Sequence, residues 1–278
     1  MISWWQSLPE QLDPTAFVVA GFSIRWYGLF WLLGFFLVWH FLSTLLKRGG
    51  EEASFRESLQ DVLVWIFFGA LIGGRLGYAL LYARESFFDS PWRFLLPFEN
   101  GVFTGFFGMS FFGGVAGVLS VLFLSSWRSP RLFFKRADYV ALATPLAIFC
   151  GRLGNFFNGE LFGRVTTVPW GMYFPLGGGV LRHPSQLYEA LFEGILLFLI
   201  LWRIRMTAPK PGVISIAFLF WYGCIRFFVE FFRAPDTDLG LWLGVFTQGQ
   251  RYSVVLLFFV GCFFWYSKRR GKGAILEG

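Results

Sequence analysis

Charged residues, cysteines and histidines are scarce in this sequence of 278 residues. Lys, Arg, Asp and Glu make up 15% of the chain, whereas a typical soluble domain contains roughly 25%. The cysteines lie inside apolar runs, and the two histidines, His40 and His183, have no ligand spacing between them. These shortages exclude a disordered chain, a nucleic-acid-binding domain and a secreted disulfide scaffold, and they predict neither a metal site nor a cofactor.

Apolar residues, in contrast, are abundant and form long runs. Hydrophobic residues make up 56% of the chain, and a run of roughly 20 is long enough for a helix to cross a bilayer. We therefore predict an all-α integral membrane protein with about seven spanning helices, organised as a single polytopic domain over residues 1–278. The expected spans are 18–46, 59–82, 109–127, 138–157, 187–205, 212–232 and 248–267.

Basic residues are concentrated in alternate connecting segments, and this asymmetry predicts an orientation. Most Lys and Arg residues outside the spans follow the first, third, fifth and seventh spans. Because short cytoplasmic loops carry the excess positive charge, we expect the N-terminus outside and the C-terminus in the cytoplasm. Segments 83–108 and 158–186 then lie on the outer face, and loops of this length often carry function. Residues 1–20 lack a basic start and a small-residue cleavage site, so we expect no removable signal peptide.

The sixth expected span carries polar residues on one helical face. Tyr222, Arg226 and Glu230 follow one another at i, i+4 and i+8, so they point in similar directions. An arginine in the middle of a membrane costs about 2.5–3.5 kcal/mol on insertion scales and needs a partner, a water-filled cavity or an anionic ligand. Two interpretations stay open here, an intrahelical ion pair that hides its own charge and a functional site.

A second polar stripe lies at the end of the fourth expected span. Arg152, Asn155 and Gly159 share a face at i, i+3 and i+7, and Asn158 and Glu160 lie next to them. The planar fork of an arginine matches phosphate oxygens, and a phospholipid head group is the anion most available inside a membrane. Two such stripes favour an anion-binding cavity over a purely structural role.

The second expected span contains a further arginine and a repeat of glycines. Arg75 lies in the segment GGRLGY, and Gly69, Gly73 and Gly77 recur every four residues. Small residues at this spacing let two helices approach closely in a membrane, so we interpret the glycines as a packing surface.

Six segments of the chain resemble, in order, the motifs of the bacterial prolipoprotein diacylglyceryl transferase family. They are RWYGLFWLLGF at 25–35, GGRLGYALLY at 73–82, GMSFFGG at 108–114, GRLGNFFNGELFGRVT at 151–166, RHPSQLYEA at 182–190 and YGCIRFFVEFFRAPD at 222–236. The resemblance extends along most of the chain. It implies a seven-span enzyme of the bacterial inner membrane with the orientation expected above.

The resemblance also implies a reaction and a set of site residues. Diacylglycerol would pass from phosphatidylglycerol to the lipobox cysteine thiol of a preprolipoprotein, with glycerol phosphate leaving, in the bilayer and without nucleic acid. Arg152 and Arg226 would bind the head group and stabilise the departing phosphate, and Tyr27 would complete the catalytic set. The substrate-binding residues implied by the motifs are Asn155, Glu160, Gly163, Tyr222, Glu230, Arg75, Gly113 and Gly114.

One position differs from the family pattern. Phe112 stands where the motif usually has a histidine that is proposed to act as a base, and a phenyl ring cannot accept a proton. Either the proton goes to solvent, phosphate or another group, or a different residue substitutes, or this copy is catalytically impaired. His183 is the histidine expected on the outer side, where it acts as a base or fixes a loop. A phospholipid or anion transporter with the same arginines is the alternative from another class.

Overall fold

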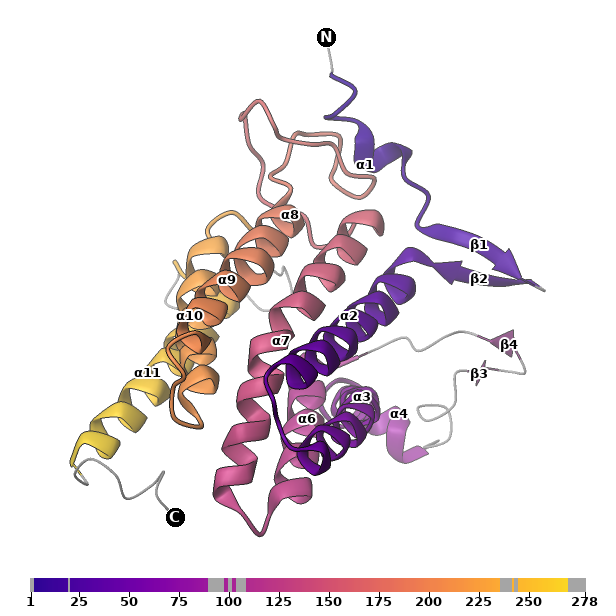
Figure 1. Ribbon diagram of the computed structural model, residues 1–278. Helices are drawn as coiled ribbons and strands as arrows, with labels where there is room; N and C mark the ends of the chain where they lie inside the picture. Colours follow the sequence, from indigo (N-terminus) through magenta and orange to yellow (C-terminus); the bar gives the residue numbers. More distant parts are fainter. Residues whose placement is uncertain are drawn as a thin grey trace. The chain divides into compact units, whose positions relative to one another are not determined.

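The computed structural model describes most of the chain (Figure 1). The described residues are 3–19, 21–89, 98–99, 102–103, 109–235, 242 and 245–269. They divide into two compact units, one formed by Met1–Phe41 with Ala137–Gly278 and the other by Leu42–Arg136.

The first unit begins with a short helix and a β-hairpin. Helix α1 covers Leu8–Gln11, and strands β1 (Thr15–Val19) and β2 (Phe22–Arg25) pair antiparallel. The first expected span, which started at residue 18, is therefore wrong at its start. Apolar and β-branched residues suit a strand as well as a membrane helix, so hydropathy alone does not distinguish the hairpin from a span.

Helices occupy the remaining expected spans of the first unit. They are α2 (Trp26–Arg48), α7 (Pro130–Phe157), α8 (Ser185–Glu189), η1 (Ala190–Leu196), α9 (Leu197–Arg205), α10 (Val213–Val229) and α11 (Gln248–Arg269). Two of them, α2 and α7, extend into the second unit, and α7 begins at residue 130 instead of 138. The stretch from α8 to α9 is one continuous helical segment. Its middle, η1, widens to the π-helical pattern of i to i+5 hydrogen bonds, a feature that often marks functional sites.

Two glycines allow helices of the first unit to approach α7 closely. A Cβ atom at Gly154 would lie 3.1 Å from the ring of Tyr27, and one at Gly194 would lie 2.8 Å from Cβ of Phe149. Side chains at these positions would push α2 and η1 away from α7. The close approach is what brings residues of three helices to the same region.

A buried carboxylate ties α10 to α7. Asp138 of α7 accepts hydrogen bonds from the backbone N–H groups of Gly212 at 2.7 Å and Ser215 at 2.8 Å, and from the hydroxyl of Ser215 at 2.7 Å. These donors belong to the first turn of α10, whose N–H groups have no partner within the helix. Asp138 therefore caps α10 from a neighbouring helix.

The second unit contains the helices on which the other candidate residues lie. Its described elements are α3 (Ala53–Tyr82), α4 (Arg84–Asp89), β3 (Phe98–Glu99), β4 (Val102–Phe103) and α6 (Phe111–Ser126). A Cβ atom at Gly73 would collide with the backbone of Gly113 and lie 3.0 Å from Cα of Gly117. The glycine repeat of α3 is thus a packing surface for α6, as predicted.

Three of the described helices are both long and apolar enough to cross a membrane. They are α2, α3 as far as Leu80, and α7, while α6 and α10 are apolar but shorter. Helices occur at all seven expected positions in the described chain. Of the long segment 83–108, residues 90–97, 100–101 and 104–108 lie outside the described residues.

Candidate active site

Six charged side chains meet in one ion-pair cluster inside the first unit. They are Arg152 of α7, Glu189 of α8, Glu193 of η1, Arg226 of α10, and Glu230 and Arg233 just after α10. Figure 1 shows α8, α9, α10 and α11 on one side of α7, to its left in this view. The two polar stripes predicted from the sequence are thus brought together in space.

Two of the carboxylates bridge Arg152 and Arg226, the two arginines of the predicted catalytic set. Glu189 Oε2 lies 2.7 Å from Arg152 Nε and 3.4 Å from Arg226 Nη1. Glu193 places Oε2 at 3.4 Å from Arg152 Nη2 and Oε1 at 3.1 Å from Arg226 Nη1. Both carboxylates therefore hold the two guanidinium groups beside each other, although like charges repel.

The glutamate side chains of the cluster are less exposed to solvent than the arginine side chains. The side chains of Glu189 and Glu193 are 0% exposed, whereas that of Arg152 is 20% and that of Arg226 is 15% exposed. The carboxylates lie beneath the arginines, and the arginines form the accessible layer. Such an arrangement leaves guanidinium N–H groups available for an anion.

The remaining carboxylate of the cluster is anchored to the start of α11. Glu230 Oε2 lies 2.8 Å from Arg226 Nη2, and its Oε1 accepts a hydrogen bond of 2.9 Å from the hydroxyl of Thr247. A Cβ atom at Gly249 would lie 2.5 Å from the Glu230 carboxyl carbon. Glu230 therefore lies against the positive N-terminal end of α11, which stabilises its charge. The intrahelical pair of Arg226 and Glu230 exists, but it is one contact of a larger network.

Sequence reasoning missed Glu189, Glu193 and Arg233 as members of the site. A signal was present, because Gln186, Glu189 and Glu193 recur at i, i+3 and i+7 in a segment that is otherwise apolar. Carboxylates on one face of a membrane helix need cationic partners, and the arginine stripes supply them.

A second polar group adjoins the cluster through α7. Glu160 Oε1 accepts hydrogen bonds from the side-chain amides of Asn155 at 2.9 Å and Asn158 at 3.3 Å. The amide of Gln186 donates to the backbone oxygen of Glu160 at 2.6 Å. Tyr27 interacts electrostatically with Glu160, Arg152 and Asn155. Asn155, Glu160 and Tyr27 are thus grouped as predicted.

Gly163 supports the site through the backbone rather than by a side chain. Its N–H donates to the carbonyl of His183 at 2.8 Å, and Arg164 N–H donates to the carbonyl of Phe232 at 2.9 Å. A Cβ atom at Gly163 would lie 2.5 Å from the Phe232 oxygen and 2.6 Å from His183. Glycine is required at this crossing, which connects the segment 158–186 to the residues after α10. Tyr222 of α10 interacts electrostatically with Arg226 and Arg152 of the cluster.

Three candidate residues belong to the second unit. Arg75 lies on α3, and Gly113 and Gly114 lie in the first turn of α6. Gly113 contacts the backbone of Gly73, so its lack of a side chain serves helix packing. Phe112, in the same turn of α6, is 48% exposed. A role of these residues toward the arginine cluster stays a prediction.

The geometry of His183 favours a role in fixing the segment 158–186. Trp170 Nε1 donates to the Tyr188 hydroxyl oxygen at 2.7 Å, and this hydroxyl lies 3.1 Å from His183 Nδ1. The tautomer of His183 sets which of the two groups, the hydroxyl or Nδ1, donates in this hydrogen bond. Partial burial lowers the pKa of His183 from its usual value. The contact engages Nδ1 and holds the imidazole ring against Tyr188.

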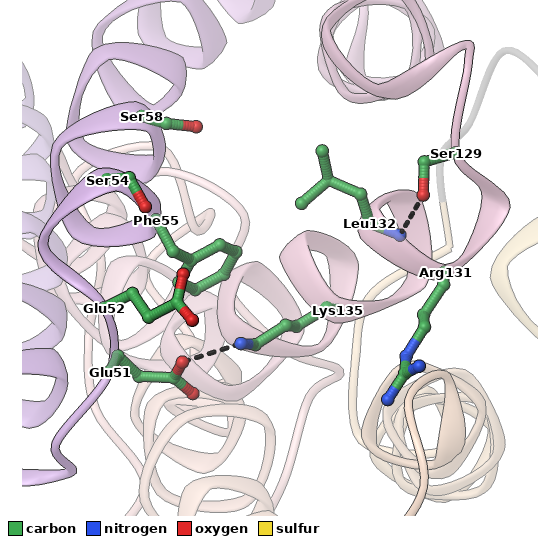
Figure 2. A pocket seen from close by; sticks show the side chains of 9 residues that line it. All are labelled: Glu51, Glu52, Ser54, Phe55, Ser58, Ser129, Arg131, Leu132 and Lys135. Atoms are coloured by element: carbon green, nitrogen blue, oxygen red, sulfur yellow. Dashed lines mark hydrogen bonds and ion pairs between the residues drawn. The ribbon is translucent and has the colours of Figure 1, made fainter.

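A hollow of about 470 Å³ lies in the second unit, among residues of a different chemistry. Figure 2 shows the Glu51 carboxylate facing Lys135, and the two form an ion pair of 2.6 Å. Its lining also includes Glu52, Ser58 and Arg131, so carboxylates and cations are mixed. This balance does not favour an anion, and the buried arginine cluster remains the better candidate.

Comparison with known proteins identifies the family of the chain. The profile of the family described as prolipoprotein diacylglyceryl transferase matches residues 14–266. A protein of Chlorobaculum tepidum named phosphatidylglycerol–prolipoprotein diacylglyceryl transferase is 46% identical over 99% of this chain and 97% of its own. Proteins of the same name are 44% identical in Pseudoalteromonas atlantica, over 90% of this chain and 85% of theirs, and 47% in Aliivibrio salmonicida, over 88% and 84%. The chain therefore belongs to the prolipoprotein diacylglyceryl transferase family.

Proposed function

We propose that this protein transfers the diacylglyceryl group of phosphatidylglycerol to the lipobox cysteine of preprolipoproteins. The observation that carries the proposal is the pair of partly exposed arginines, Arg152 and Arg226, held side by side over buried carboxylates. Membership of the family and the names of the relatives support the same substrates.

The chemistry explains why such a pair is needed. The cysteine sulfur attacks a saturated glyceryl carbon, a carbon–sulfur bond forms, and the bond from that carbon to the phosphate oxygen breaks. The phosphate keeps the electron pair, so negative charge grows on the leaving oxygen. Arg152 and Arg226 stabilise this charge with N–H donors that are already in place, which is the most effective form of electrostatic catalysis.

The other polar residues shape the pocket around the head group. Asn155 and Glu160 offer an amide and a carboxylate to the glycerol hydroxyl groups, and Tyr27 supplies a phenol beside them. Tyr222 and Glu230 hold Arg226 in place, since Glu230 pairs with it at 2.8 Å. Arg75, Gly113 and Gly114, which lie in the second unit, are proposed to bind substrate from the family motifs alone.

The thiol must also lose a proton. A cysteine thiol has a pKa near 8.5, so its ionisation at pH 7 costs only about 2 kcal/mol. Phosphate departure from a saturated carbon is the harder step. The proton therefore goes to solvent or to the phosphate, and the phenyl ring of Phe112 does not prevent the reaction.

The proposed setting is the bacterial inner membrane, crossed seven times with the N-terminus outside. A reporter that is active only outside the cytoplasm should be positive when fused after Ser90 or Leu176. The same reporter should be silent after Pro130 or Lys210. The opposite pattern would place the segment 158–186 on the cytoplasmic side and contradict the proposal, because preprolipoproteins present their lipobox on the outer side.

Purified protein tests the reaction directly. Incubation with phosphatidylglycerol micelles and a lipobox peptide should add the mass of one diacylglyceryl group to the peptide, as measured by mass spectrometry. A peptide with serine in place of the cysteine is the control and should stay unmodified. Binding of phosphatidylglycerol without any transfer would instead favour an impaired paralogue, for which Phe112 is the sequence argument, or an anion transporter.

A further inference from the structure

The arginine cluster is electrically balanced before any substrate binds. The ion pairs among the described residues join three arginines to three glutamates. Because every pair lies in a largely buried region, the charges are weakly screened by solvent. One unit of charge more or less would therefore change the affinity of the cluster for anions.

Anion affinity matters differently for the substrate and the product of the proposed reaction. The phosphodiester of phosphatidylglycerol carries one negative charge. The glycerol phosphate that leaves is a monoester with a second pKa of about 6, so it carries close to two charges at neutral pH. A cluster with a net positive charge would bind the product more tightly than the substrate, and turnover would then be limited by release.

Among the carboxylates of the cluster, Glu193 forms ion pairs with the two catalytic arginines alone in the described part of the chain. These pairs measure 3.4 Å to Arg152 and 3.1 Å to Arg226, and Tyr222 also interacts electrostatically with Glu193. Glu189 also pairs with Arg233 at 3.4 Å, and Glu230 is anchored by Thr247. Glu193 therefore pairs with the two catalytic arginines and with no other cation of the described residues.

The backbone places Glu193 for this contact. Residue 193 lies in the π-helical turn η1, and a Cβ atom at the neighbouring Gly194 would lie 2.8 Å from Phe149 of α7. The carboxylate is 0% exposed and lies beneath the arginines, so it does not meet the substrate. Its effect on the reaction passes through the guanidinium groups.

We propose that Glu193 is a positioning residue that keeps the Arg152–Arg226 pair charge-balanced and thereby lets the phosphate product leave. The proposal rests on the proposed function, because it concerns the release of glycerol phosphate. With Glu193 ionised, the arginines meet a phosphate as a neutral group with spare N–H donors. Without the charge of Glu193, the two arginines carry an excess positive charge and bind the dianionic product too tightly for rapid release.

The test compares two variants of Glu193 that separate charge from shape. Glu193→Gln keeps the size and removes the charge, and should tighten the binding of glycerol phosphate about tenfold or more. Its kcat should fall while its KM for phosphatidylglycerol falls or stays constant. Glu193→Asp keeps the charge, so its affinity for glycerol phosphate should stay within about threefold of the parent, although the shorter side chain lowers kcat.

Two measurements on the purified protein supply these values. Calorimetry with glycerol phosphate gives the product affinity without any need for transfer activity, and initial rates give kcat and KM. Glu51→Gln is the matched control, because it removes a carboxylate from the 2.6 Å pair with Lys135 in the second unit. It should change neither product affinity nor turnover.

The outcomes separate this proposal from the proposed function. Unchanged or weaker glycerol phosphate binding by Glu193→Gln, in a background where the parent protein is active, would overturn the role of Glu193. Equal tightening by Glu193→Asp would also overturn it, because charge would not be the cause. A parent protein that neither transfers nor binds glycerol phosphate would refute the proposed function itself. If Glu193→Gln does not fold, Glu189→Gln removes the same charge from the same two arginines and takes its place.

Discussion

Buried arginines are accommodated in two different ways in the two units of this molecule. In the second unit, Arg136 is 6% exposed and donates to the Ser125 carbonyl at 2.6 Å, to the Ser126 hydroxyl at 3.0 Å and to the Ser58 hydroxyl. No carboxylate among the described residues pairs with it. In the first unit, Arg152 and Arg226 are paired with carboxylates and stay partly exposed.

The difference shows which buried arginines can bind a ligand. Arg136 satisfies its charge with neutral oxygens and with the negative C-terminal end of α6, and it has no accessible surface to offer. Within the described part of the chain, no ion pair involves Nη1 of Arg152 or Nε of Arg226, and both side chains are partly exposed. The first kind of arginine joins helices, and the second kind can meet an anion. Burial alone does not identify a functional arginine.

The largest effect on transfer activity is expected for the carboxylate-paired arginines. Replacing Arg152 or Arg226 with alanine should lower the transfer rate by roughly 10²–10³, because each removes stabilisation of the departing phosphate. Lysine should restore only part of the rate, since an ammonium group lacks the bidentate fork. Initial rates of peptide modification measure this, with membrane-inserted protein quantified beside them. Normal turnover in both alanine variants would contradict the phosphate site.

Arg136→Met should lower the stability of the fold and leave the transfer activity of the folded protein nearly unchanged. The substitution leaves the Ser58 and Ser126 hydroxyls and the Ser125 carbonyl without their donor, which costs about 1–3 kcal/mol of folding free energy. Activity per folded molecule should change less than about twofold, because no reacting atom is touched. Thermal unfolding in detergent and the specific activity of the folded fraction are the two measurements. A hundredfold loss of specific activity without loss of stability would break the comparison.

Phe112→His tests whether the reaction lacks a proton acceptor because a phenyl ring stands where the family motif has a histidine. General acid–base catalysis contributes about 10²–10⁴ where it is needed. We expect a change of less than about tenfold, because phosphate departure and not thiol ionisation limits the rate. Phe112→Leu is the control for side-chain volume. A gain above a hundredfold in initial rate would show that a proton acceptor was absent, and would favour the impaired paralogue.

The smallest effect is expected at His183. Burial lowers its pKa in the folded protein, so the unfolded chain takes up the proton first as the pH falls. The stabilising contribution of the neutral ring is therefore complete above the unfolded pKa of about 6.5 and is lost as the pH decreases below it. The pH dependence of thermal unfolding should flatten below this value in His183→Gln. The shape of the rate profile between pH 5 and 8 should be unchanged, whereas loss of its acidic limb in His183→Gln would identify His183 as a base.

The sequence predicted the helices well and their ends less well. Runs of apolar residues indicate where a helix can lie in a bilayer, and described helices occur at all seven positions. The start of the first span was wrong because residues 18–19 lie in strand β1 and residues 22–25 form strand β2. Hydropathy measures transfer into lipid, and an apolar strand beside a helix has the same signature.

The site was predicted in part, for a reason that lies in helical periodicity. Spacing along one helix groups Arg152 with Asn155, and Arg226 with Glu230, because it depends on the helix alone. Periodicity cannot say which residues of another helix will lie opposite. Glu189 and Glu193 were therefore missed, although their spacing is visible once their partners are known.

Composition and motif order by themselves determined that this is a helical membrane protein with arginines in its apolar spans, and that it resembles one family. Only the tertiary structure decided how those arginines are neutralised. The charge of Arg152 is met by carboxylates from α8 and η1, at distances of 2.7 Å and 3.4 Å, because Gly194 lets η1 approach α7. That contact depends on packing between segments about 40 residues apart in the chain, and such packing leaves no periodic signal in the sequence.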